Sequence, residues 1–153
     1  MIEIEKISTE LLTILQENLK ENSDNIQIPP PIFEAMKGEV MEFDLERGYL
    51  KNRFPVLNEQ LNPYGKMQGG MIAAAIDNTL GPLSLLVAPP NFTRHLEVKY
   101  KKIVSPEIGY IYVTGIFLEK KKGLLFFQAS VANSDGDELA SAKATHWIID
   151  GKS

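Results

Sequence analysis

The stretch NPYGKMQGGMIAAAIDNTLG, residues 62–81, joins a turn and a glycine pair to an almost wholly apolar run that carries one carboxylate, Asp77. Residues 68–80 include the strong helix formers Ala73 to Ala75, so they predict a helix. A helix that is apolar all round is normally buried. An aspartate is almost never fully buried without a partner, because a carboxylate that leaves water loses its hydration. The stretch therefore predicts a central helix and singles out Asp77.

Alternating β patterns lie on both sides of this predicted helix. Residues 39–56 read as two strands around the turn ERG, and four more strands are expected at 93–104, 109–120, 123–133 and 138–149, with tight turns at Lys121–Gly123 and at 134–137. In the last strand Ala140, Ala142 and Ala144 share one face. Small residues let a sheet approach a bulky helix closely. The sequence thus predicts an α+β fold in which an antiparallel sheet of five or six strands wraps around one central helix.

The first 35 residues predict a separate extension. Apolar residues close to helical spacing indicate an amphipathic helix over residues 1–20, and the segment ENSDNIQIPPP reads as a polar linker stiffened by prolines. A short helix is expected around 32–36. We therefore divide the chain into a helix and linker at residues 1–35 and a folded domain at residues 36–153.

Composition narrows the classes of function. The 153 residues fit one domain, and the formal net charge of −4 argues against nucleic acid as the main partner. No cysteine is present to form a disulfide, a thiolate nucleophile or a zinc ligand, and we expect no metal site. The start MIEIEK does not resemble a signal peptide, and Asp77 with the prolines after it interrupts the best apolar window. We therefore expect a cytoplasmic protein without a membrane span.

Two interpretations are open for each notable residue of the helix. Asp77 could meet a solvent cleft or cap a neighbouring segment, or it could be held at a cleft for proton transfer or nucleophilic attack. Gly69 and Gly70 leave backbone amides unobstructed where the helix dipole favours negative charge, which suits a developing oxyanion. They would equally suit close packing against the sheet.

The spacing of these residues favours a site made by two chains. Gly69 and Asp77 are eight residues apart, which is roughly 12 Å along a helix axis and about 80° around it. A carboxylate at that position cannot reach a carbonyl group held at the first turn of its own helix. A second copy whose helix runs the other way would bring the two parts together, so we expect a two-fold dimer with two shared sites.

The order of these residues along the chain resembles that of the hotdog-fold acyl-CoA thioesterases, in particular the small phenylacetic-acid-pathway-type branch. The resemblance covers roughly residues 39–149. Each motif alone is a weak signal, whereas the motifs together and in this order are specific. The matching positions are Asn62-Pro63-Tyr64-Gly65, Gln68-Gly69-Gly70, Asp77, and Thr93 with Tyr100 seven residues later. The resemblance implies a hotdog fold, two protomers whose sheets join edge to edge, and a homodimer or dimer of dimers (a tetramer) that hydrolyses acyl-CoA or aryl-CoA.

The resemblance also implies roles for single residues. The Gly69 amide would bind the thioester carbonyl, with Gly70 beside it, and Asn62 would orient the carbonyl or the attacking water. From the other chain, Asp77 would act as general base or nucleophile, and Thr93 would hold the water or the carboxylate. Coenzyme A would enter as part of the substrate, so no separate cofactor is implied.

One position departs from the family pattern: Gln68 stands where the family has histidine. Glutamine forms hydrogen bonds but carries no imidazole proton at neutral pH. The alternative is therefore a non-enzymatic acyl-CoA-binding or regulatory hotdog protein. The two histidines are expected to be structural, His146 packed in the core and His95 on the same strand face as Thr93. Hydratase activity is disfavoured, because NPYGKM lacks the histidine that the related hydratases place near Asn-Pro.

Two lysine clusters interrupt the acidic character of the chain, Lys101 with Lys102 and Lys120 to Lys122. Such runs are usually solvated faces or hairpin turns, and a smaller share bind anionic ligands. If the substrate is a CoA thioester, its phosphates need cationic partners. We therefore expect Lys101, Lys102, Lys120, Lys121 and Lys122 to contribute to substrate binding.

Overall fold

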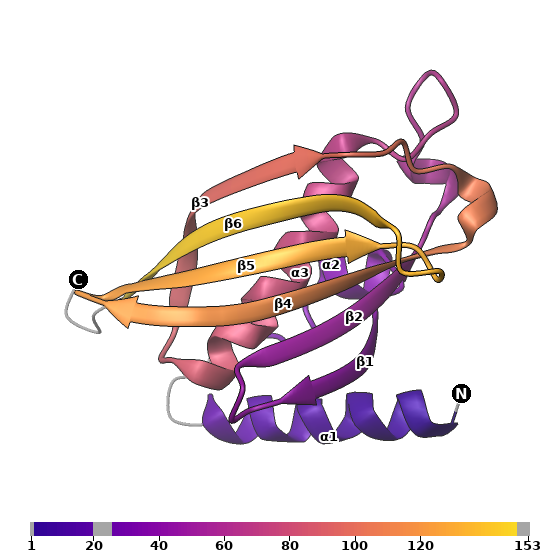
Figure 1. The fold of residues 1–153 in the computed structure, drawn as a ribbon. Coiled ribbons are helices and arrows are strands. Elements are labelled where there is room, and N and C mark those ends of the chain that lie inside the picture. Colours follow the sequence, from indigo (N-terminus) through magenta and orange to yellow (C-terminus); the bar gives the residue numbers. More distant parts are fainter. Residues whose placement is uncertain (1, 20–25, 150–153) are drawn as a thin grey trace.

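The computed structural model describes residues 2–19 and 26–149, and its six strands form one antiparallel sheet in the order β1-β2-β4-β5-β6-β3 (Figure 1). The helices are α1 (Ile2–Asn18), α2 (Pro31–Ala35) and α3 (Gly69–Val87). The strands are β1 (Glu39–Asp44), β2 (Tyr49–Pro55), β3 (Asn91–Tyr100), β4 (Tyr110–Lys121), β5 (Leu124–Ala132) and β6 (Glu138–Ile148). The predicted α+β fold is confirmed, with six strands.

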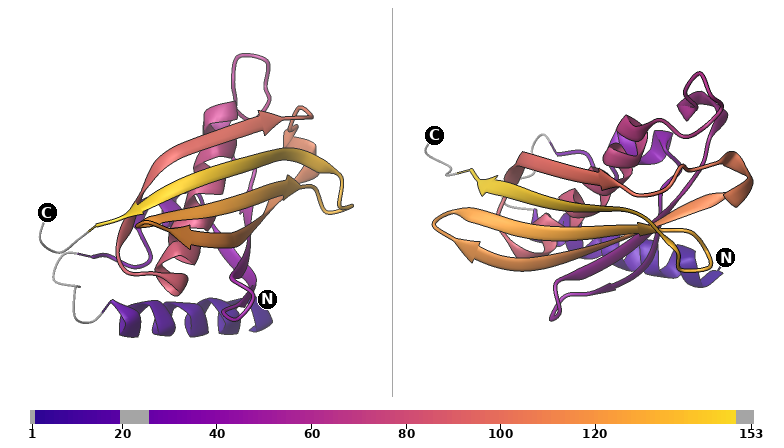
Figure 2. Two further views of the ribbon diagram at one scale, coloured as in Figure 1. Left: turned by 60° about the vertical axis from the view of Figure 1, so that its left-hand side comes forward. Right: turned by 45° about the horizontal axis from the view of Figure 1, so that its top comes forward.

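The sheet curves around α3, and α1 lies outside this unit (Figure 2). Helix α1 packs against β1 and α3 through the buried side chains of Leu11 and Leu15. It thereby lies beside one edge strand of the sheet, while β3 forms the other edge. Helix α1 packs against the edge strand β1, whereas several side chains of the other edge strand, β3, are exposed, including Phe92 (60%) and Tyr100 (49%).

Small residues let the sheet approach α3, as the sequence predicted. Ala140, Ala142 and Ala144 are all buried on the concave face of β6. On β4, a Cβ added to Gly115 would lie 2.8 Å from a side-chain carbon of Leu80 on α3. A side chain at this position would force Leu80 to move, so glycine favours the close approach of helix and sheet.

Helix α3 is longer than expected: it continues from residue 80 to Val87 and contains Pro82. Proline has no N–H to donate to the carbonyl four residues earlier, which here belongs to Asn78. The side-chain amide of Asn52 on β2 donates to that carbonyl at 3.4 Å and to the Thr79 hydroxyl at 3.2 Å. Tertiary contact with β2 thus satisfies the backbone group that Pro82 leaves free, and the helix ends only before Pro89.

A β-bulge in β3 overturns the expected placement of His95. Thr93 pairs with His146 and His95 pairs with Thr145, so Arg94 is an extra residue in the strand. Directly opposed residues in a sheet share a face. Thr93 therefore lies on the same face of the sheet as the buried His146, although Thr93 itself is exposed, whereas His95 lies on the opposite face and is also exposed. The expectation that His95 shares the face of Thr93 was wrong, because alternation fails across a bulge.

By length and composition, α3 is also the single helix in residues 2–19 and 26–149 that would suit a membrane span. Its most buried residues, among them Ala75, Ile76 and Leu80, pack beneath the sheet as part of the hydrophobic core. The apolar character of α3 is therefore that of a core helix.

Candidate active site

Asp77 is half-buried on α3 and faces the start of β3. The hydroxyl group of Thr93 donates a hydrogen bond to Asp77 Oδ1 at 2.7 Å. Asp77 and Thr93 line a cavity of about 290 Å³ together with His146 from β6 and Asn91 from β3. A carboxylate fixed by a hydroxyl donor at a cavity wall can accept a proton or attack a carbonyl carbon.

The hydrogen bonds around His146 define its tautomer. Asn91 donates its amide to the Pro89 carbonyl at 2.9 Å, so its Oδ1 accepts from His146 Nδ1–H at 2.8 Å. His146 Nε2 is then unprotonated and lies 3.4 Å from Thr93 Oγ1. Burial lowers the pKa of His146, and the charge of nearby Asp77 opposes that shift. The prediction that His146 is packed in the core is confirmed, since the residue is 1% exposed.

The buried His146 predicts loss of stability in mild acid. The pKa of His146 is lower in the folded protein than its ordinary value of 6.5, so the unfolded chain takes up the proton first. The melting temperature should therefore fall as pH drops below about 6.5. His146→Phe should remove this part of the pH dependence, whereas His95→Gln, which removes an exposed histidine, should retain it. Equal slopes for all three proteins between pH 7.5 and 5.5 would contradict the assignment.

Gly69 lies at the other end of α3, in contact with the end of β3. The Tyr100 hydroxyl donates to the Gly69 carbonyl at 2.6 Å, and burial raises the pKa of Tyr100, which keeps this donor protonated. A Cβ at Gly69 would lie 3.2 Å from the Tyr100 ring. Both residues line a second cavity of about 500 Å³ together with Asn62. Gly69 is therefore the residue that allows Tyr100 to approach the first turn of α3.

The first turn of α3 offers hydrogen-bond donors. The amides of Gly69 and Gly70 have no acceptor within the described part of the chain, as is usual for the first residues of a helix. Asn62 Oδ1 accepts from the amides of Tyr64 and Lys66 at 2.9 and 3.1 Å, which orders the preceding loop. The side-chain amide group of Asn62 is then available as a donor at the cavity.

Gln68 is the N-cap residue of α3, and its side chain is exposed and makes no capping hydrogen bond. Its backbone carbonyl accepts from the amides of Met71 and Ile72 at 2.9 and 3.2 Å. The side chain is therefore free to contact a ligand, although helix formation does not depend on it.

The two halves of the candidate site are separated within one chain. The cavity with Asp77 and the cavity with Gly69 have no lining residue in common. Helix α3 joins them on one side, and β3 joins them on the other, since Thr93 lies near its start and Tyr100 at its end. The structure thus brings Asp77 together with Thr93, and Gly69 with Asn62, but keeps the two pairs apart.

The lysine clusters also lie at opposite ends. Lys101 and Lys102 line the cavity of Gly69, and Lys101 forms an ion pair with Glu138 at 2.7 Å. Both lysines follow β3, which ends at Tyr100 rather than at residue 104 as expected. Their amides donate instead to the Leu139 carbonyl, at 2.8 and 3.1 Å, which turns the chain away from the strand.

Lys120 and Lys121 end β4, and Lys122 lies in the β4–β5 turn, near the half of the site that contains Asp77. Lys120 pairs with Leu125 of β5, and Leu125 pairs with His146 of β6. The hairpin therefore lies at the end of the sheet that holds Asp77. Across residues 2–19 and 26–149, no group of three or more acidic or histidine side chains is arranged to hold a metal ion.

Sequence reasoning missed the contacts of His146 and Asn91. Both depend on the register that sets Thr93 opposite His146, which is a long-range property of the sheet. The one local signal was Asn91 itself, two residues before Thr93 in the sequence.

A six-stranded antiparallel sheet wrapped around a long central helix is the hotdog fold. No family model matches the chain, and no curated protein sequence matches it. Several solved structures do resemble this protein in fold. PaaI of E. coli, from the phenylacetic acid degradation operon, is 13% identical with a TM-score of 0.75, covering 92% of this chain and 97% of that one. A thioesterase candidate of Ralstonia eutropha JMP134, a phenylacetic acid degradation-related protein, is 20% identical with a TM-score of 0.74, covering 88% and 98%.

A third similar structure contains a ligand. The protein smu.793 of Streptococcus mutans UA159 was solved bound to acetyl-CoA, and it is 20% identical with a TM-score of 0.69, covering 82% of this chain and 94% of that one. At these identities the comparisons establish the hotdog fold, in agreement with the resemblance of the motif residues to that family.

Proposed function

We propose that this protein hydrolyses acyl-CoA or aryl-CoA thioesters at a site shared by two chains. The observation that carries the proposal is the pairing of Asp77 with Thr93 at one end of α3 and β3, and of Gly69 with Asn62 at the other. Each half lacks what the other supplies. The acetyl-CoA bound to a protein of the same fold supports a CoA thioester as the ligand.

The exposed edge strand β3 is the proposed dimer contact. An edge strand presents unpaired backbone groups that can pair with another strand. Antiparallel pairing of β3 with its copy would set the Thr93 end of one chain near the Tyr100 end of the other, as a two-fold axis requires. Each dimer would then hold two complete sites, and the dimer could double to a tetramer. Light scattering should give a dimer or tetramer, and a fully active monomer would refute this arrangement.

The proposed reaction uses both halves. The Gly69 amide binds the thioester oxygen and stabilises the negative charge that develops on it. Asp77, held by the Thr93 hydroxyl, accepts a proton from water as the water oxygen bonds to the carbonyl carbon, or attacks that carbon itself and forms an anhydride. The carbon–sulfur bond then breaks, and the CoA thiolate leaves and takes up a proton from protonated Asp77 or from water. If Asp77 was the nucleophile, a water molecule then hydrolyses the anhydride, which releases the acid and restores the carboxylate. We place this activity in the cytoplasm.

A thiol-release assay tests the function directly. A panel of short, long and aromatic acyl-CoA thioesters should include at least one that releases CoA with turnover. Release of CoA from none of them, together with measurable binding, would favour the non-enzymatic acyl-CoA-binding protein.

Gln68 is the observation that favours that alternative, because the exposed glutamine cannot transfer a proton. Gln68→His should leave turnover equal to or higher than in the wild type, since it introduces the residue of the family pattern at an exposed position. Gln68→Ala is the matched control, which removes the polar group without adding an imidazole. A loss of activity in Gln68→His would contradict the assigned role of this position.

Charge reversal at the lysine clusters tests the CoA contacts. Replacing Lys101 and Lys102, or Lys120 to Lys122, by glutamate should raise the KM for CoA thioesters severalfold, because the phosphates lose cationic partners. The effect should shrink at high salt, since salt screens exposed charges. Lys51→Glu, a change on β2 outside both cavities, is the control. Unchanged KM for both clusters would exclude them from CoA binding.

A further inference from the structure

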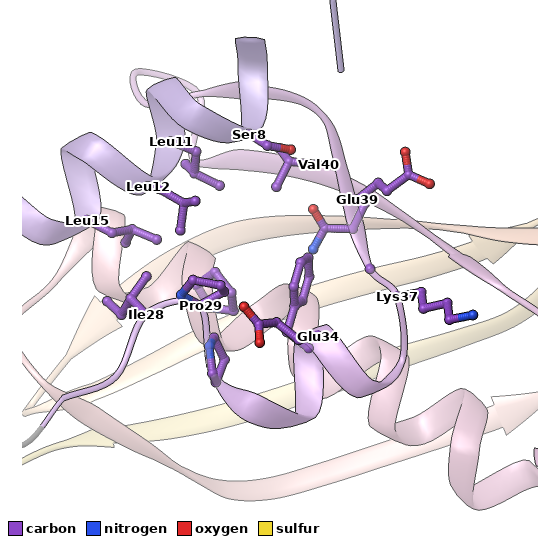
Figure 3. Close-up of a pocket in the computed structure, with 15 residues that line it drawn as sticks. Ser8, Leu11, Leu12, Leu15, Ile28, Pro29, Glu34, Lys37, Glu39 and Val40 are labelled. Carbon is purple, nitrogen blue, oxygen red and sulfur yellow. The ribbon is translucent and has the colours of Figure 1, made fainter. Parts of the chain in front are cut away.

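A third cavity lies between α1 and the hotdog unit (Figure 3). It measures about 460 Å³, within the range of roughly 300–1,000 Å³ that is usual for small-molecule sites. Figure 3 shows Leu11, Leu12 and Leu15 of α1 on one side and Ile28 and Pro29 on the other. The cavity is partly open to solvent, and most of the residues that line it are apolar.

The lining of this cavity suits an apolar group. Apart from Asn52 and Ser8, its polar members are the charged residues Glu34, Lys37 and Glu39. Asn52 is fully buried, and both of its amide contacts are made to α3, at the Thr79 hydroxyl and the Asn78 carbonyl. Asn52 therefore offers no free donor to an anionic ligand. Most of the remaining lining residues are apolar, so a hydrocarbon chain would pack against them.

The cavity adjoins the Asp77 site. Four residues line both cavities: Leu15, Ile28, Pro30 and Pro82. A thioester carbonyl held at Asp77 would thus have an apolar space next to it, and that space is formed largely by α1 and residues 28–40.

We propose that the cavity under α1 receives the acyl chain of the substrate, so the enzyme prefers long apolar acyl groups to short ones. The inference rests on the proposed thioesterase function. An engineered apolar cavity of about 150 Å³ is enough to hold benzene. The cavity here, at about 460 Å³, has room for a chain on the order of ten carbons.

Chain-length dependence of kcat/KM is the primary measurement. From butanoyl-CoA to decanoyl-CoA, each added methylene should raise kcat/KM about fourfold until the cavity is filled, as expected for burial of a methylene group. Leu12→Trp, which fills the cavity from α1, should reduce kcat/KM for decanoyl-CoA at least about tenfold and leave butanoyl-CoA unchanged. Ser8→Phe should act similarly and serves as a second variant in case Leu12→Trp folds poorly.

Gln16→Trp is the matched control, because it adds the same ring to an exposed position of α1. A flat chain-length profile in the wild type would overturn the inference, and so would a Leu12→Trp profile parallel to that of the wild type. Both outcomes leave the proposed function intact if butanoyl-CoA is hydrolysed. If no thioester is hydrolysed, calorimetric titration with decanoate tests the cavity alone. Binding that Leu12→Trp abolishes and Gln16→Trp retains would support the cavity as an acyl-chain site. Equal binding by the wild type and both variants would overturn the inference.

Discussion

Asp77→Asn should lower kcat for acyl-CoA hydrolysis by about 10²–10⁴-fold, the usual cost of losing a general base. The amide keeps the shape of the side chain and an oxygen that can accept from Thr93, which donates at 2.7 Å in the native structure. It removes the negative charge that takes the proton or attacks the carbonyl carbon. Because folding and substrate contacts are retained, the affinity for acyl-CoA and the oligomeric state should stay near those of the wild type.

Three measurements on one preparation distinguish this result from a structural role of Asp77. They are kcat, the Kd for a CoA thioester and the melting temperature. A structural role predicts a lower melting temperature with turnover per molecule near the wild type, and that outcome would remove Asp77 from the mechanism. Asp135→Asn is the control, since it neutralises an exposed carboxylate in the β5–β6 turn that lies in neither cavity. It should leave all three quantities unchanged.

Gly69→Pro should lower kcat by about 10²–10³-fold, because proline has no amide to bind the developing oxyanion. The backbone accepts proline here: Gly69 is the first residue of α3, and Gln68 before it has φ −62° and ψ 138°, as a residue that precedes proline requires. Gly69→Ala keeps the amide and adds only the Cβ that meets Tyr100. The difference in kcat between the two variants isolates the contribution of the N–H group.

Combining the two inactive variants tests whether the site is shared. A dimer with one Asp77→Asn chain and one Gly69→Pro chain would contain one site with both native residues and one site with neither. The mixed dimer, purified after co-expression with two different tags, should therefore regain about half of the wild-type activity. If Asp77 and Gly69 of the same chain worked together, the mixed dimer would be as inactive as its parents.

The sequence predicted the fold because its local signals agree with one another. Apolar runs, alternation and turn residues all indicated a sheet around the helix that contains Asp77, and Gly115 and the β6 alanines fit that arrangement. The end of α3 was missed because local rules make Pro82 a helix breaker. Asn52, thirty residues earlier and on another element, supplies the missing hydrogen bond to Asn78. A long-range contact of this kind leaves no trace in local propensity.

The candidate site could be predicted only in part from the sequence. The motif order gave Asn62, Gly69, Asp77 and Thr93, and helix geometry already indicated that Gly69 and Asp77 must act from different chains. The environment of His146 was not accessible, because it depends on strand register and on the β-bulge at Arg94. A single inserted residue reverses which side chains face inward, and the pattern of apolar and polar residues in β3 does not predict this bulge.

The exposed edge of β3 also bears on the tendency of the protein to aggregate in the cell. A single chain with an uncovered strand, and with Phe92 and Tyr100 exposed along it, is a template onto which other unpaired strands can add. Freshly synthesised chains would face this hazard until they meet a partner. If β3 pairs with its copy, the same association that completes the site also removes the template, so substitutions that weaken the pairing should yield aggregated protein rather than inactive monomers.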